Sequence, residues 1–519
     1  MHGADPPSRL SLAELLADLS LVTDLGVGNE PETAARTCLL ATGLARGVGL
    51  TEDVVADVFY TALLLHLGCT ASAHEAAALY GGDDIAVNAS GARTDLTAPA
   101  QILTTWLPGV LKGLPLRTKL RAGATALVRG GRVGALLQTA SCEVAAGTAR
   151  RLGLSAGVQE AIGQAFESWN GKGRQRMAGE AIAVPIRVAQ VAALAALFDR
   201  LGGPESAVAV IAHRSGRVLD PGLAAAFVRL GPNLLGEMGG VDVRAMVVAS
   251  EPEPRRRVGE PELNGIAAAF GDLADLKSPS MLGHAAGVAA LAEAAGRELH
   301  MNAEELTCLR RAGLLHDIGR VGVPSGIWDE AGPLTTSQWE RVRLHPYYTE
   351  RILARSAALA DAGRIAGMHH ERQDGSGYHR QTNGQGIPLA ARVLAAADAF
   401  QAMTQPRPFR PALEPAKAAA ALGTEVTEGR MDPDAVAAVL AACGQRRRAR
   451  RSWPGGLTAR EVEVLRLLAV GLSARQVAQQ LVISPKTADH HIQHIYTKLG
   501  ISTRAAAALY AMEHGLLPD

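Results

Sequence analysis

The sequence has few aromatic residues and no long apolar run. Phe, Trp and Tyr make up 4% of its 519 residues, although 48% of the residues are hydrophobic. The interior must therefore be packed mainly by Ala, Leu, Val and Gly, which favours closely packed helices over a β-sandwich. No apolar run reaches the ~18–20 residues needed to span a bilayer. We therefore expect an all-α protein without membrane contact.

The sequence also lacks paired cysteines, a leader segment and a large net charge. Its five cysteines are widely spaced without a C-x-x-C motif, which argues against a disulfide framework or a Cys-rich zinc site. The N-terminus MHGADPPSRL has no signal-peptide pattern, so a cytoplasmic protein is expected. Because the net charge is +1, any surface for nucleic acid must be a local patch.

Four short segments occur twice in the same order, which indicates an internal repeat. We predict two copies of one helical domain, the first copy within residues 1–250 and the second copy within 262–445. A third domain is expected at 455–519. The paired segments are Leu63–Gly68 with Leu314–Gly319, Glu167–Gly173 with Glu371–Gly377, Ile182–Val188 with Ile387–Val393, and Asp220–Phe227 with Asp432–Val439.

Local patterns in the first copy predict its elements. Apolar residues at three- and four-residue steps predict helices over residues 12–19, 34–48 and 53–67. Residues 81–99, rich in Gly and Asp, are expected to form a loop. A further helix is expected over 117–153, broken at Gly130–Gly131.

The second copy contains a His-Asp pair in the segment LLHDIGR. An isolated pair of this kind could be a core histidine beside a helix-capping aspartate. Here further His and Asp residues follow in one ordered series, and imidazoles with carboxylates suit Zn, Mn, Fe, Ni or Co. A carboxylate can bridge two metals, an arrangement used for phosphoester hydrolysis. The series is His284, His316, Asp317, His345, His369, His370 and Asp398.

This order is similar to that of the HD superfamily of metal-dependent phosphohydrolases. The segments HDIGR, HHERQDGSGY and IPLAARVLAAADAF resemble the HD-GYP branch, which hydrolyses cyclic di-GMP. The resemblance covers residues 275–440 and implies two divalent metals, Fe, Mn or another transition metal. It implies that His284, His316, Asp317 and Asp398 hold one metal, that His345, His369 and His370 hold the other, and that Asp317 bridges them.

The resemblance also implies a substrate pocket. Arg320 would contact the phosphate and act with Asp317 as a catalytic residue, and the loop with Asp374, Gly375, Gly377 and Tyr378 would shape the nucleotide pocket. The sequence departs from the family at four positions. Arg320 replaces a Lys, His379 a Pro, Gln401 an Asp, and Ser280 a Glu that provides a third metal in some members.

The first copy lacks these ligands. His66 falls where Asp317 should be and is most simply a core histidine. The first copy is therefore interpreted as a pseudo-domain, serving as a scaffold or dimer surface, a ligand sensor in an old pocket, or a lid. The replacements are Leu65, His66, Ala165, Phe166, Asn170 and Ala193 for His316, Asp317, His369, His370, Asp374 and Asp398.

Residues 456–516 predict a small four-helix domain with a helix-turn-helix. Thr458 with Glu461 forms a capping-box pattern, and Ser473 and Ser484 are further N-cap candidates. The segment is similar to the LuxR-type DNA-binding domain along its whole length. The alternative is a helical bundle that binds protein. The resemblance implies DNA-facing residues Lys486, Thr487, His490, His491, Gln493 and His494, with phosphate contacts from Lys498 and Arg504.

The leading hypothesis is a cytoplasmic transcriptional regulator. Its HD-GYP-like domain would hydrolyse or sense cyclic di-GMP, and its C-terminal domain would bind promoter half-sites as a homodimer. The basic run 446–451 would add phosphate contacts or serve as a plain linker. A non-catalytic nucleotide sensor and a phosphohydrolase acting on another nucleotide remain alternatives.

Overall fold

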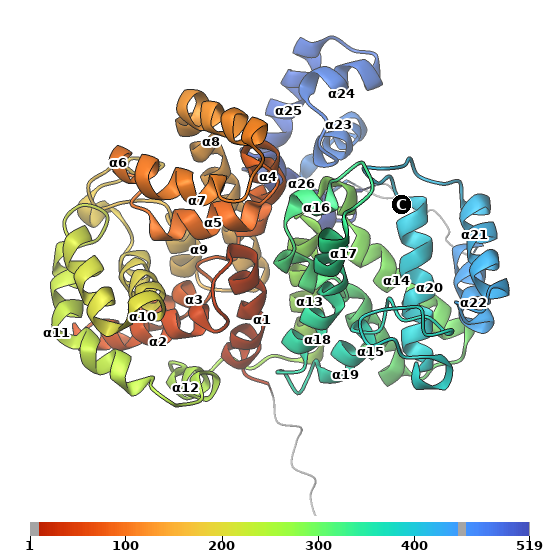
Figure 1. Ribbon diagram of the computed structural model, residues 1–519, viewed down its shortest axis with the longest axis horizontal. Helices are drawn as coiled ribbons and strands as arrows, with labels where there is room; N and C mark the ends of the chain where they lie inside the picture. The colour runs from red at the N-terminus through yellow and green to blue at the C-terminus, as the bar shows by residue number, and fades with distance from the viewer. Residues whose placement is uncertain (1–9, 445–452, 518–519) are drawn as a thin grey trace, which may run out of the picture. The chain divides into compact units, whose positions relative to one another are not determined.

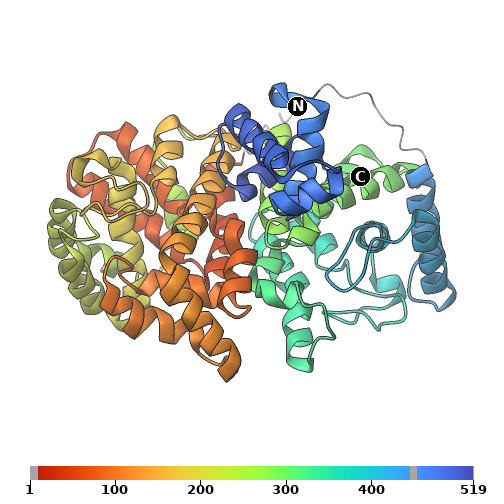
Figure 2. The same cartoon turned by 90° about the horizontal axis from the view of Figure 1, so that it is seen from above.

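The computed structural model describes residues 10–444 and 453–517. The basic run 446–451 lies outside the described residues. Within them the regular structure is entirely helical, apart from isolated β-bridges, as two perpendicular views show (Figures 1 and 2). The all-α prediction is confirmed. In the part of the chain that the structure describes, every helix is too short or too polar to cross a lipid bilayer.

The chain divides into two compact units, residues 1–265 and 266–519, each described here by itself. In the first unit α2, α3 and α10 pack on one another, and α11 packs on α2 and α10. The main helices are α1 (Leu12–Val27), α2 (Thr33–Gly47), α3 (Glu52–Leu63), α4 (Ala73–Tyr80), α5 (Asp84–Arg93), α6 (Pro99–Gln101), α7 (Leu107–Leu111), α8 (Leu116–Arg151), α9 (Ala156–Gly163), α10 (Val184–Arg214), α11 (Pro221–Glu237), α12 (Val243–Ser250) and α13 (Glu260–Asp275), which runs into the second unit.

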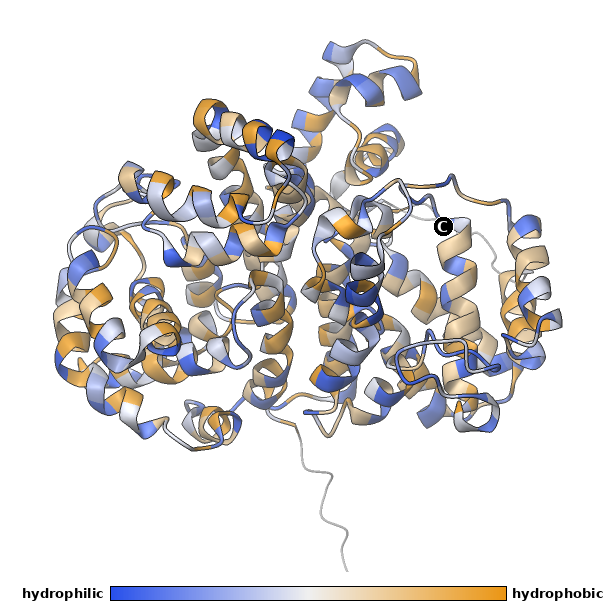
Figure 3. Ribbon diagram, in the orientation of Figure 1, coloured by the Kyte–Doolittle hydropathy of each residue, from blue (hydrophilic) through white to orange (hydrophobic). Residues whose placement is uncertain are grey.

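In the second unit α14 packs against α15, α20 and α22. Helix α20 is apolar along most of its length, whereas α17 is hydrophilic (Figure 3). The helices of the second copy are α14 (His284–Glu298), α15 (Ala303–Leu315), α16 (Ser325–Trp328), α17 (Thr336–Arg343), α18 (His345–Leu353), α19 (Ala360–Ala366), α20 (Leu389–Thr404), α21 (Pro415–Thr427) and α22 (Pro433–Gly444), with the short 3₁₀ helices η5 (Ile318–Gly322) and η6 (Gly384–Gly386).

The two copies repeat the same contacts as well as the same helices. The Arg187 guanidinium pairs with Asp220 at 2.7 Å, and Arg392 pairs with Asp432 at 3.0 Å. The N–H of Ala34 donates to Asp24 at 3.1 Å, and that of Ala285 donates to Asp275 at 3.0 Å. These matched contacts support the predicted duplication and align Thr33, which opens α2, with His284, which opens α14.

Two local expectations for the first copy are wrong. The expected loop contains α5, because Asp83 caps it by accepting from the N–H of Ala86 at 2.9 Å. Helix α8 runs unbroken through Gly130 and Gly131. Glycine in an exposed helix interior costs only about 1 kcal/mol relative to alanine, and the Leu, Arg and Ala neighbours favour helix.

The C-terminal residues form α23 (Ala459–Ala469), α24 (Ala474–Leu481), α25 (Pro485–Leu499) and α26 (Arg504–Glu513). The predicted capping box of Thr458 and Glu461 is present. Ser473 and Ser484 cap the next two helices as predicted. The turn between α24 and α25 passes through Val482 in the left-handed region at φ 54°. The helix-turn-helix prediction is therefore confirmed.

Candidate metal centre

Helix ends bring the predicted metal ligands together. His284 and His345 open α14 and α18, while His316 closes α15 and is followed by Asp317. The pair His369-His370 follows α19, and Asp398 lies within α20. All seven side chains are buried except that of His370, which is half-buried.

Three of the imidazoles are oriented by a backbone carbonyl that lies just before them in the chain. The Nδ1 atoms of His316, His345 and His369 lie 2.8, 2.5 and 2.6 Å from the carbonyl oxygens of the residues three positions earlier. A carbonyl oxygen can only accept, so each Nδ1 carries the proton. Each Nε2 atom therefore presents a lone pair to the centre, the orientation typical of metal-ligating histidines.

The ligand atoms form overlapping groups around Asp317. The Asp317 carboxylate lies 3.3 Å from His345 Nε2, 3.5 Å from His316 Nε2 and 3.7 Å from His369 Nε2. The ligand atoms of each group lie within 4.8 Å of one another. The groups are His284, His316 and Asp398; His316, Asp317 and His369; and His345, His369 and His370.

Burial and neighbouring charges shift the pKa values of several of these ligands. Burial lowers the pKa of His369 to about 3 and also lowers the pKa of His284 and of His370. Burial alone would raise the pKa of Asp317, but His316, Arg320 and His345 outweigh it and hold that pKa well below its usual range. The centre therefore offers neutral imidazoles at His284, His369 and His370 and an ionised carboxylate at Asp317, which suits a divalent cation.

Two observations show that the residues fit a cation. The Nε2 atoms of His345 and His369 lie 3.2 Å apart, and both present lone pairs because both Nδ1 atoms hold the proton. The buried Nε2 of His316 has no hydrogen-bond partner among the described residues. Facing lone pairs and an unpaired buried acceptor are both unfavourable, and a metal ion would relieve both.

Arg320 lies at the edge of this centre. Its guanidinium donates to Asp317 at 3.2 Å and stacks 3.7 Å above the Trp328 ring. Trp328 itself packs edge-on against His345. Arginine grips phosphate oxygens in pairs, so the position suits a phosphate contact.

The predicted substrate loop folds back over the histidine pair. Tyr378 packs against the His370 ring with 4.7 Å between ring centres. Gly377 lies so close to the backbone of His370 and Glu371 that any side chain would clash, at 2.5 Å. Asp374 is turned into its own loop, where it accepts from Ser376, and Gly375 adopts φ 77°.

Sequence reasoning assigned no role to two further groups. The Glu371 carboxylate accepts the N–H groups of Arg380 and Thr382 at 2.7 and 2.9 Å, so it holds the loop in place. Its position directly after the HH pair was the available signal. Arg407 approaches His284 Nδ1 at 3.5 Å and donates to Ser280. No sequence pattern marks Arg407, because a distant loop carries it to the site.

The predicted DNA-facing residues lie on one helix, α25. Ala488, Ile492 and Ile495 face its core side, which leaves Lys486, Thr487, His490, Gln493 and His494 exposed and His491 half-buried. Two predicted phosphate contacts already have internal partners. Lys498 pairs with Glu461 at 2.7 Å, and Arg504 donates to the carbonyl of Gly471 at 3.1 Å.

Comparison with known proteins shows which families two parts of the chain match. The HD domain family matches residues 269–435, and the bacterial regulatory proteins of the luxR family match residues 456–511. The chain is 32% identical over 432 residues to 3'3'-cGAMP-specific phosphodiesterase 3 of Vibrio cholerae, covering 82% of this chain and 94% of the relative. It is 37% identical over 140 residues to a cyclic di-GMP phosphodiesterase of the same organism, covering 26% and 28%. A crystal structure of a cyclic GMP-AMP specific phosphodiesterase from V. cholerae matches with 29% identity and a TM-score of 0.58, covering 85% of this chain and 99% of that one.

Proposed function

Because the chain belongs to the HD-domain family of metal-dependent phosphodiesterases and carries a LuxR-type domain, we propose that it hydrolyses a cyclic dinucleotide. We further propose that the hydrolytic site is coupled to DNA binding. The observation that carries the proposal is the set of seven ligands in the second copy, six of them buried, with backbone carbonyls orienting His316, His345 and His369. Cyclic di-GMP and 3'3'-cGAMP are the two substrates to be compared, since relatives of both names match.

The ligand groups would suit two divalent ions of Fe, Mn or another transition metal: His284, His316, Asp317 and Asp398 would hold one ion, His345, His369 and His370 the other, and Asp317 would serve both. When bound, such ions supply Lewis acidity and an activated water for phosphoester hydrolysis. The chain's own part is to place the phosphate. Arg320, held by Trp328 and Asp317, stabilises charge that develops on the phosphate oxygens. Arg320 cannot deliver a proton to the leaving group, because guanidinium stays charged at every working pH. Tyr378 closes one side of the pocket by packing on His370.

The proposed DNA contact is the exposed face of α25, with Lys486 on phosphate and Gln493 and His494 at base edges. We propose a cytoplasmic homodimer, because such domains bind paired half-sites. Lys498 and Arg504 would add less than predicted from sequence, since both have internal partners.

The test is turnover of both cyclic dinucleotides by the full chain loaded with Mn or Fe, beside the Asp317→Ala variant. We expect turnover that Asp317→Ala abolishes. A chain that binds the nucleotide without turning it over would instead be a sensor, an outcome that the replacement of the family's lysine by Arg320 makes worth measuring.

Coupling is tested by promoter footprinting with and without nucleotide. A footprint unchanged by the double variant Lys486→Ala/His490→Ala would count against the assigned DNA face.

A further inference from the structure

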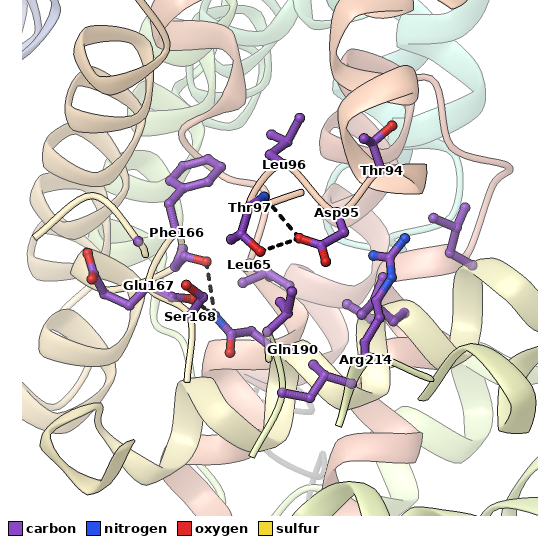
Figure 4. Close-up of a pocket in the computed structure, with 18 of the residues that line it drawn as sticks. Leu65, Thr94, Asp95, Leu96, Thr97, Phe166, Glu167, Ser168, Gln190 and Arg214 are labelled. Carbon is purple, nitrogen blue, oxygen red and sulfur yellow. Dashed lines mark hydrogen bonds between the residues drawn. The ribbon is translucent and has the colours of Figure 1, made fainter. Parts of the chain in front are cut away.

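The first copy encloses a cavity where the second copy holds its metal ligands. The cavity has a volume of about 260 Å³ and is lined by residues of the first unit (Figure 4). Its walls include the counterparts of six of the seven ligands. Thr33 stands for His284, Leu65 for His316, His66 for Asp317, Ala165 for His369, Phe166 for His370 and Ala193 for Asp398.

These replacements remove metal binding but leave the space. Among the described residues, no group of three metal-ligating side chains lies in the first copy. Burial lowers the pKa of His66 to about 4, so its imidazole is neutral. Leu65, Phe166 and Ala193 give the cavity an apolar floor at the positions where the second copy has metal ligands. Gln190 fixes one side by donating to the carbonyls of Ala165 and Glu167 at 3.3 and 2.7 Å.

The first copy has also gained a buried cation. Arg214, at the end of α10, lines the cavity and is 5% exposed. Its guanidinium donates to the Arg93 carbonyl at 2.7 Å and lies over the Phe198 ring. Figure 4 shows Arg214 and Asp95 on one side of the cavity and Phe166 to Ser168 on the other. Within the described part of the chain, no carboxylate lies within ion-pair distance of Arg214; burial lowers its pKa, and Asp95 opposes that shift from further away.

The two buried carboxylates beside the cavity already have partners. Asp95 pairs with Arg217 at 3.1 Å and accepts from both the N–H and the hydroxyl of Thr97. Glu167 accepts the N–H groups of Gln175 and Met177 at 2.6 and 3.1 Å. Asp95 is thus held by Arg217 and Thr97, and Glu167 by backbone N–H groups, so neither carboxylate contacts the Arg214 guanidinium. A buried guanidinium charge is unfavourable unless an anion meets it.

We propose that this cavity is a metal-free binding site for a small organic oxyanion, a phosphate or carboxylate carried on an apolar or aromatic body. Arg214 would hold the oxyanion, since guanidinium matches both groups with paired hydrogen bonds. Leu65, Phe166 and Ala193 would cover the apolar body. The cavity volume lies just below the usual range of small-molecule pockets, about 300–1,000 Å³. The ligand would therefore be about the size of one mononucleotide. The proposal does not depend on catalysis by the second copy.

The test uses calorimetric titration of the full chain carrying Asp317→Ala and treated with a chelator, so that the second copy holds no metal. The probes are GMP, benzoate and uncharged guanosine. We expect GMP or benzoate to bind once per chain, and the one that binds identifies the oxyanion. Guanosine should bind at least about tenfold more weakly than GMP, because it lacks the charge.

Two variants locate the binding. Arg214→Gln should weaken it at least about tenfold, and Ala193→Phe, which fills the cavity, should abolish it. Arg229→Gln makes the same chemical change at an exposed position of α11 and should leave binding unchanged. Thermal melting checks that each variant folds. If Arg214→Gln does not fold, the result with Ala193→Phe decides the test. Failure of both anions to bind, or binding unaffected by Arg214→Gln and Ala193→Phe, would overturn the proposal, whatever the turnover assay shows.

Discussion

The two copies share their supporting contacts and differ at their centres. In both, an arginine near the start of a core helix pairs with the aspartate that caps a later helix, as Arg187 does with Asp220 and Arg392 with Asp432. In both, a glutamate accepts two backbone N–H groups of the following loop, as Glu167 and Glu371 do. The centres of these frames contain an apolar cavity in one copy and seven His and Asp ligands in the other.

This difference shows that the frame does not require its metal ligands. Buried polar ligands are unfavourable unless they are fully partnered, whereas apolar replacements of similar size can be neutral or stabilising. The repeated Arg–Asp and Glu–backbone contacts hold the fold, and the ligands serve the site. Four experiments test this division of roles between the frame and the ligands.

The largest effect is expected at matched positions of the two centres. Gly68 packs against the backbone of Ser141, and Gly319 packs against the backbone of His345. Ser141 in the first copy therefore corresponds to His345 in the second. His345→Ala should reduce turnover more than about 1,000-fold, beyond the loss from a single oxyanion donor, because it removes a ligand. It should also lower the metal content measured by mass spectrometry. Ser141→Ala should change neither. Equal losses of turnover in the two variants would show that the first copy takes part in the reaction.

Arg320→Ala should come next in size. Cys69 stands at the corresponding position of the first copy, which has no cation there. Losing the guanidinium should reduce turnover about 100-fold by removing one charge stabiliser, while metal content stays at the wild-type level. Arg320→Lys, which restores the residue usual in the family, should recover most of the rate. A drop in metal content for Arg320→Ala would show that the side chain supports the ligands rather than the phosphate.

The shared glutamates should give matched losses of stability. Glu167→Gln and Glu371→Gln each replace one of two accepting oxygens with a donor, leaving a backbone N–H unpaired. Each should lower the free energy of unfolding by about 1–3 kcal/mol, measured by denaturant titration. Only Glu371→Gln should also slow turnover, because its loop carries Tyr378. Unequal stability losses would mean that the frame contacts are not equivalent.

A further prediction concerns Asp24, a buried carboxyl of α1 that accepts the N–H of Ala34 in α2. Burial raises the pKa of Asp24 from 3.8 to about 7, so the folded chain keeps this proton when the unfolded chain has lost it. The resulting stability is present below pH 3.8 and is lost as the pH rises to 7. Asp24→Asn should therefore unfold at a higher temperature than wild type at pH 8, with little difference at pH 4. Exposed Asp53→Asn is the control, and an equal shift in it would refute the assignment.

Much of this comparison could be predicted from sequence. The duplication, the helical fold, the caps Thr458, Ser473 and Ser484, and the ordered ligand series all depend on local patterns. Residues that reach a site through distant loops could not be predicted. Arg407 and Arg214 have no motif, and Ser141 could not be aligned with His345 because the first copy has a long insertion before α8. The helix α5 was missed because glycine and aspartate suggested a loop, although Asp83 is its cap.

The hydrogen bonds from Nδ1 of His316, His345 and His369 reach only three residues back along the chain. Each ligand's direction is thus encoded locally, independently of the other ligands. Single substitutions could therefore remove ligands one at a time without disturbing the orientation of those that remain. A duplicated domain built in this way can give up catalysis gradually, and its emptied interior becomes available for selection toward another ligand.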